Sequence, residues 1–143
     1  MKFIGTYEAL SEWLDDLLCK KQFGGDKRLS SEIAFKLSNL AQSELDTAQL
    51  GALSVARSFW DGLAPQEQLH AAAKSLADRI TVNQGIAEKH RIYNLDRLVF
   101  AASNANTMFD ILVAEYLIDL ATDLDMNPKL VADIFVEELQ RRL

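Results

Sequence analysis

The sequence has little of the residues that cross-link, break or anchor a chain. It contains one cysteine, Cys19, two prolines and six glycines in 143 residues. A single cysteine excludes an internal disulfide and a cysteine-rich zinc site. No run of about 18 uninterrupted apolar residues occurs, so we expect no transmembrane helix. Glu8 and Glu12 interrupt the N-terminal segment before an apolar signal core could form, so we expect a cytoplasmic protein.

Alternating apolar and polar residues, the pattern of a half-buried strand, are also missing. Apolar residues instead recur every three or four positions, which predicts an all-α protein. Hydrophobic residues make up 49% and charged residues 25% of the sequence, as in an ordinary globular domain. The length suits one domain with one core. We therefore predict a single domain over residues 1–143, built as a bundle of six or seven helices.

Helix boundaries follow from capping and helix-breaking residues. Thr6 has the side chain of an N-cap for the first helix, and Gly24 and Gly25 break the chain after it. Ser43, with an acid three residues later, predicts a capping box for the third helix. The second helix is expected to bury Leu40. The predicted helices cover residues 7–21, 31–40, 43–62, 65–82, 92–102, 109–124 and 128–143, with a loop or a broken helix around residues 83–91.

The sixth predicted helix, FDILVAEYLIDLATDL, is apolar around most of its circumference. Thr107 and Asp110 have the spacing of a capping box at its start. A helix of this kind must be surrounded by other helices or by a partner, so we expect it at the centre of the fold. Its few polar residues fall on one narrow stripe, which consists of Glu115, Asp119, Thr122 and Asp123.

Residues 119–135, DLATDLDMNPKLVADIF, resemble the two-helix core of helix-turn-helix DNA-binding domains. The resemblance rests on apolar residues at the packing positions and on Asn127 as the cap of the second helix. The sequence departs from the motif at Asp125, where the turn usually has glycine; Asp tolerates the left-handed conformation but adds negative charge. Asn127 and Pro128 stop one helix and start the next, so we expect two helices that meet at residues 124–127. The resemblance implies a helix-turn-helix-like corner near the C-terminus, with Lys129 and Asn127 as contact residues if it read DNA.

Charge argues against DNA as the partner of this corner. Residues 1–69 have a net charge of −3, residues 70–109 of +2 and residues 110–143 of −5. Phosphate contact needs clustered cations, yet the corner lies in the most acidic third of the chain. Its second helix presents Leu130 and Asp133 where basic or polar side chains would read bases. Nucleic acid is therefore a disfavoured partner.

No catalytic motif stands out, so the sequence favours a protein that is not an enzyme and that needs no cofactor. The Gly24–Gly25 pair lacks the lysine and Ser/Thr of a phosphate-binding loop, and no nucleophile elbow occurs. One enzymatic alternative stays open, a Mg²⁺-dependent all-α nucleotide hydrolase. This alternative requires two groups of acidic residues to converge on one cation. The simpler interpretation is that these acids are the solvent-facing stripes of their helices. The two groups are Glu12, Asp15 and Asp16, and Glu115, Asp119 and Asp123.

The apolar helix faces favour a non-enzymatic regulatory or protein-interaction domain that acts through helix-face recognition. Apolar residues of the last helix span too wide an arc for one internal contact, so we expect a protein partner or a second copy of the chain to cover them. The expected partner-binding residues are Leu130, Phe135, Val136 and Leu139. A homodimer could also pair the +2 middle segment with the −5 C-terminal segment. The first alternative is a transcription regulator that uses residues 119–135, and the second is the hydrolase.

Overall fold

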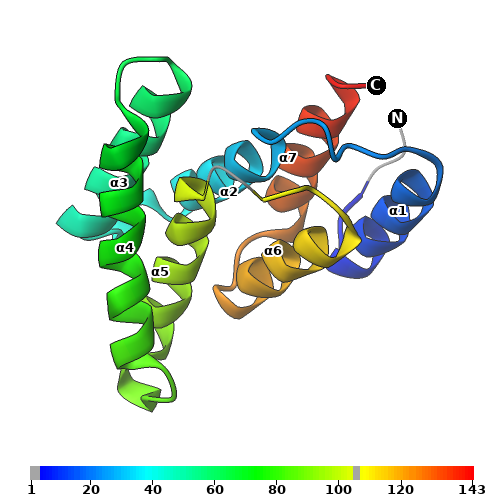
Figure 1. Ribbon diagram of the computed structural model, residues 1–143. Coiled ribbons are helices and arrows are strands. Elements are labelled where there is room, and N and C mark those ends of the chain that lie inside the picture. The colour runs from blue at the N-terminus through cyan, green and yellow to red at the C-terminus, as the bar shows by residue number, and fades with distance from the viewer. Residues whose placement is uncertain (1–3, 105–106) are drawn as a thin grey trace.

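Seven α-helices account for most of the chain in the ranges that the structure describes (Figure 1). This computed structural model describes residues 4–104 and 107–143. Within these ranges no strand occurs, so the all-α prediction is confirmed. The helices are α1 (Tyr7–Lys20), α2 (Leu29–Leu40), α3 (Thr47–Trp60), α4 (Gln66–Asn83), α5 (His90–Ser103), α6 (Ile111–Asp123) and α7 (Pro128–Gln140), with short 3₁₀ helices η1 (Gln42–Glu44) and η2 (Ala87–Lys89).

Two helix caps, at Thr6 and Asn127, form where the sequence predicts them. The Thr6 hydroxyl accepts a hydrogen bond from the backbone N–H of Ala9 at 3.1 Å and caps α1. The Asn127 side chain accepts from the backbone N–H of Lys129 at 2.9 Å, and Pro128 is the first residue of α7. Asp125 lies between the two helices with φ of 55°, a left-handed conformation that Asp tolerates better than most residues. The predicted pair of helices meeting at residues 124–127 is therefore confirmed.

Three local predictions are wrong. Ser43 does not cap α3, because it lies inside η1; Asp46 is extended and exchanges hydrogen bonds with Gln49 in a capping box. Asp110, not Thr107, caps α6 by accepting from a backbone N–H three residues later. Leu40 is 41% exposed because α2 ends there and the chain turns away.

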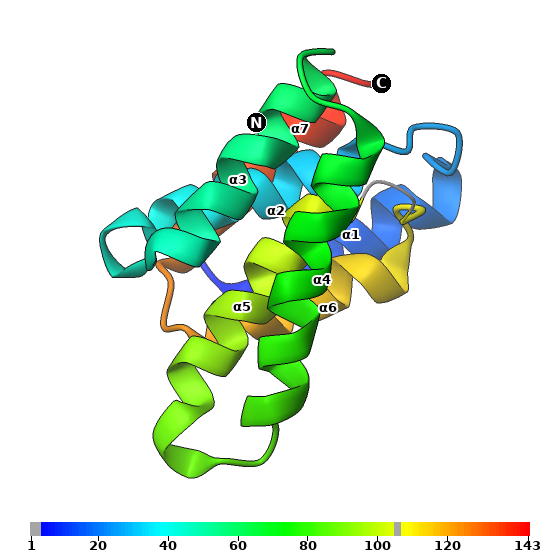
Figure 2. The same cartoon turned by 60° about the vertical axis from the view of Figure 1, so that its left-hand side comes forward.

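The centre of the fold is the pair α2 and α5, which pack along each other. Figure 1 shows α3 and α4 against α5 at one end of the molecule and α1 beside α6 at the other, and Figure 2 shows the long α4 running beside α5. The prediction that α6 is central is wrong. It buries Leu117 and Leu120 but leaves Leu112 76% and Tyr116 37% exposed, since α1, α2, α5 and α7 together cover only part of its circumference.

An ionic network joins α3, α4 and α5 around the fully buried Asp96. Gln49 donates to its carboxylate at 2.7 Å, and Arg79 Nε donates at 3.2 Å. Arg79 also donates to Asp46 at 2.7 Å. Burial raises the pKa of Asp96 in spite of these donors, whereas the hydrogen bond from Arg79 lowers the pKa of Asp46.

A second ionic network joins α2 to α7 around Glu138, whose side chain is also fully buried. Lys36 donates to one of its oxygens and Arg142 to the other, the latter at 2.8 Å. Arg142 also donates hydrogen bonds to Glu32, at 2.9 Å, and to Asp26. Burial alone would raise the pKa of Glu138, but the hydrogen bonds from Lys36 and Arg142 outweigh it and hold the pKa below its usual range.

None of the helices in residues 4–104 and 107–143 combines the length and the apolar character that a membrane span requires.

Candidate functional site

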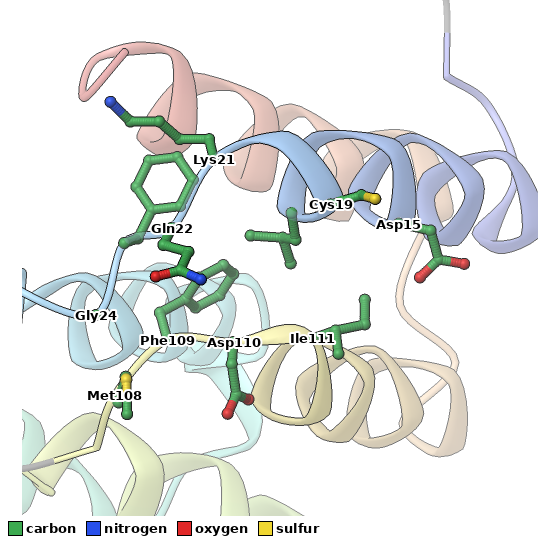
Figure 3. Close-up of a pocket in the computed structure, with 11 residues that line it drawn as sticks. Asp15, Cys19, Lys21, Gln22, Gly24, Met108, Phe109, Asp110 and Ile111 are labelled. Atoms are coloured by element: carbon green, nitrogen blue, oxygen red, sulfur yellow. The ribbon is translucent and has the colours of Figure 1, made fainter.

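A hollow of about 480 Å³ opens between α1 and the start of α6 (Figure 3). Its walls come from two segments that are far apart in the sequence. The Asp15 side chain extends from α1 toward α6, and Ile111 extends from α6 toward α1. Most of the surface between them is apolar. This α1–α6 hollow is lined by Asp15, Leu18, Cys19, residues 21–24 and residues 108–111.

Local structure holds the two walls of the α1–α6 hollow in place. The chain leaves α1 at Lys21, which is extended with φ of −136° and ψ of 133°. Phe23 then turns into the core and meets Phe109 edge-on, with ring centroids 6.4 Å apart. Asp110 accepts a hydrogen bond from the Val113 backbone N–H at 2.9 Å and so fixes the start of α6. Both walls are therefore anchored by buried or capped residues next to the opening.

Met108 stands at the rim of the hollow and is 56% exposed. It lies so close to Gly24 that a Cβ there would be 2.7 Å from the Met108 sulfur. Glycine thus permits a close contact between the two walls. A flexible and polarizable methionine at a rim suits an adaptable binding surface.

The helices on either side of the hollow carry the net charge of the whole chain. Each of α1 and α6 has a net charge of −3, and together they equal the −6 of the complete sequence. All seven of their carboxylate side chains are exposed. Only Asp16 forms an ion pair with a described residue, Lys20. The seven are Glu8, Glu12, Asp15, Asp16, Glu115, Asp119 and Asp123.

A second and smaller hollow lies between α5 and α6, with a volume of about 300 Å³. Phe100 and Ala101 of α5 face Val113 and Leu117 of α6 across it, and Tyr116 lies at its edge. We call it the α5–α6 hollow. No charged side chain lines it among the residues that the structure describes.

The structure places the predicted partner-binding residues of α7 differently from our expectation. Phe135 and Leu139 have no exposed surface and Val136 is 5% exposed, because α2 and the rest of the core cover this face. Only Leu130, at 47% exposure, is accessible. The apolar arc of α7 therefore gives no support to a homodimer, which stays a prediction for sedimentation to test.

The residues of the DNA-binding alternative, Asn127 and Lys129, lie at the surface, but their surroundings do not suit contact with DNA. Asn127 uses its side-chain oxygen to cap α7. Lys129 is exposed, with exposed Asp125 and Asp133 on either side of it in the sequence. Phosphate binding needs a cluster of cations, so DNA binding stays the disfavoured alternative that it was from the sequence.

The two acidic groups of the hydrolase alternative do not converge on one point. Among described residues, no three His, Cys, Asp or Glu side chains come close enough to share a metal ion. The carboxylates instead spread along the exposed sides of α1 and α6.

Comparison of the chain with protein-family models, curated proteins and solved structures found no match. The two hollows and the charge around them are the features of the molecule that bear on its function. Sequence patterns did not reveal either hollow, since each is formed by segments that meet only in the folded chain. The one local signal was the clustering of turn-forming residues at Gly24–Gly25 and at 103–107, next to which the walls form.

Proposed function

We propose that the chain is a non-enzymatic protein-interaction domain that binds a basic amphipathic segment of a partner protein at the α1–α6 hollow. The proposal rests on two features that occur together. The larger of the two hollows is mostly apolar, and it lies between the two helices that hold the chain's net negative charge. Interfaces commonly combine an apolar centre with a charged rim. The hollow supplies the first. Asp15 and Asp110 line it beside Lys21 and begin the second, and the other exposed carboxylates lie elsewhere on α1 and α6.

The chemistry of the partner follows from the rim. Six of the seven carboxylates on α1 and α6 have no ion pair with a described residue, so a partner's Lys or Arg side chains would meet accessible charges. Such exposed pairs contribute little to affinity, but they speed association and reject acidic partners. Affinity would come from apolar side chains that enter the hollow beside Leu18 and Ile111. An amphipathic helix presents both features on adjacent faces.

This proposal moves the interaction surface from α7 to α1 and α6. The α7 face fails as a docking surface because the core covers it, whereas the α1–α6 hollow is open. Regulation of the partner through this contact would be the biological role. The same negative charge disfavours nucleic acid, whose phosphates it repels.

The test is fluorescence anisotropy with two labelled synthetic helices, one of leucine and lysine and one of leucine and glutamate. We expect the lysine peptide to bind, with affinity that falls as salt rises, and the glutamate peptide not to bind. The double variant Asp15→Lys/Glu115→Lys should weaken binding by about tenfold or more, which is about 1.4 kcal/mol. Leu18→Asp should weaken it as well by making the wall polar.

The matched control is Glu67→Lys/Glu88→Lys, which makes the same change in net charge at exposed positions of α4 and η2. It should leave the affinity for the lysine peptide almost unchanged. Equal losses in the two double variants would mean that only overall charge matters, and the proposed site would then be wrong. Absence of binding to the wild-type chain would also contradict the proposal.

A further inference from the structure

Arg142, just beyond the end of α7, joins three segments of the chain through one guanidinium. It donates to Asp26 in the loop between α1 and α2, to Glu32 of α2 at 2.9 Å and to Glu138 of α7 at 2.8 Å. Its side chain is 16% exposed, so water competes little for these contacts. A guanidinium has its N–H donors in a fixed plane, and one arginine can therefore fix several acceptors relative to each other.

The contact between Arg142 and Asp26 leads to the α1–α6 hollow. Asp26 closes a turn in which its backbone N–H donates to the Phe23 carbonyl at 3.0 Å. Gly24 lies within this turn, and both Phe23 and Gly24 line the hollow. Asp26 and Arg142 are not among the lining residues. Arg142 therefore holds, from behind, the wall that the chain forms after α1.

The same turn also contacts the opposite wall of the hollow. Phe23 is buried in the core, and Gly24 lies against Met108 at the rim (Figure 3). Asp26 uses Oδ1 to accept hydrogen bonds at 3.1 and 3.2 Å from backbone N–H groups at the start of α2, and Oδ2 to accept from Arg142. A displacement of Asp26 would thus move Gly24 relative to Met108.

We propose that Arg142 is a positioning residue for the α1–α6 hollow: through Asp26 it sets the position of the wall formed by residues 21–24 relative to Met108. A binding surface keeps its geometry only when the residues behind it are locked by packing and hydrogen bonds. A wall that is fixed beforehand also costs less to order when a partner docks. The end of α7 thus controls how well the hollow binds, although Arg142 does not line it.

Two measurements test this inference, and one of them rests on the proposed function. That one is the affinity for the lysine peptide. The other is independent of any partner: it is the NMR signal of the Met108 methyl group in protein labelled with ¹³C at its methionine methyl groups, which reports the contact of Met108 with Gly24. Met126, which is buried just before the start of α7, supplies the reference signal.

Arg142→Met should shift the Met108 signal and weaken binding of the lysine peptide by roughly threefold to tenfold, because the wall must then be ordered as the peptide binds. Lys36→Met is the matched control. It makes the same change in net charge and also removes a cation from Glu138, but it leaves the contact between Arg142 and Asp26 in place. It should neither shift the Met108 signal nor weaken binding.

Asp26→Asn breaks the same contact from the other side, and it serves alone if Arg142→Met does not fold. Asparagine keeps the oxygen that accepts from the start of α2, but it places an amide N–H donor where Arg142 needs an acceptor. We expect the same shift of the Met108 signal and the same loss of affinity. The control is Glu32→Gln, which removes the same charge from a different contact of Arg142 and should leave both measurements close to the wild-type values.

The inference would be overturned if the Met108 signal were unchanged in the variants at Arg142 and Asp26, or if it shifted equally in the two controls. It would also be overturned if this signal moved while the affinity for the lysine peptide stayed at the wild-type value. If the wild-type chain did not bind the peptide at all, the proposed function would be wrong, and the Met108 signal alone would decide whether Arg142 positions the wall.

Discussion

Replacing Arg79 with methionine should leave the Asp96 carboxylate buried without its cation. Asp96 has no exposed surface, and Arg79 contacts both of its oxygens, at 3.0 Å and 3.2 Å. Removing one partner of a buried ion pair costs about 3–5 kcal/mol of unfolding free energy. The Arg79 side chain is 30% exposed, and Gln49 continues to donate to Asp96. We therefore expect the lower end of the range, about 3 kcal/mol near pH 7.

The dependence on pH follows from the direction of two pKa shifts. The pKa of Asp96 is raised in the fold, so its contribution to stability is present below the unfolded-state pKa and is lost as the pH rises through the folded-state pKa. Arg79→Met raises this pKa further. The pKa of Asp46 is lowered by Arg79, so its contribution is present above the unfolded-state pKa and is lost as the pH falls through the folded-state pKa. Both effects make the cost of Arg79→Met largest near neutral pH and smaller in acid.

Urea unfolding followed by circular dichroism at several pH values measures this cost. The matched background is Asp96→Asn, which removes the buried charge but keeps an oxygen for Gln49. In that background Arg79→Met should cost about 1 kcal/mol or less, the value of the partly exposed pair with Asp46. Equal costs in the two backgrounds, or a cost that does not change with pH, would refute the idea that Arg79 neutralises Asp96.

Two further predictions concern packing and the second ionic network. Phe135→Ala should lower the free energy of unfolding by about 3–5 kcal/mol, because Phe135 is fully buried. Leu112→Ala should change it by about 0.5 kcal/mol or less, because Leu112 is 76% exposed. Similar losses for the two variants in urea unfolding would contradict the burial described. Glu138→Gln should lower the free energy of unfolding by about 1–3 kcal/mol near neutral pH. Glu137→Gln, at the exposed neighbouring residue, should lower it far less. Since the pKa of Glu138 is lowered, this cost should fade as the pH falls through the folded-state pKa, and an undiminished cost in acid would exclude an ionic origin.

Features that depend on a few neighbouring residues could be predicted from the sequence. The cap at Thr6, the turn at Asp125 and the start of α7 at Pro128 each follow from backbone and side-chain preferences within about one helical turn. The capping box of α3 was placed too early because Ser43 and Asp46 both have suitable side chains. The choice between them depends on η1, a short element that sequence periodicity does not reveal.

Features that depend on which helices meet could not be predicted in this way. The apolar arc of α7 indicates that Phe135 and Leu139 are buried, but it does not say whether the same chain or a partner buries them. The α1–α6 hollow requires that the residues after α1 lie beside those before α6. Asp96 gave no sign of burial, because its partners Gln49 and Arg79 are on other helices.

The position of α5 between two groups of helices has a consequence for local unfolding. On the α3–α4 side, α5 is the main support of these two helices. They join the contiguous core through Ala52, Leu53 and Leu76, whereas the buried residues Ala56 and Leu69 lie outside it. Opening of α3 and α4 as one cooperative unit would therefore leave α1, α2, α6 and α7 packed. Partial opening of this kind costs less than global unfolding. It would expose Asp96 to water, where its carboxylate ionises without penalty, so a rise in pH favours this partly open state over the closed one.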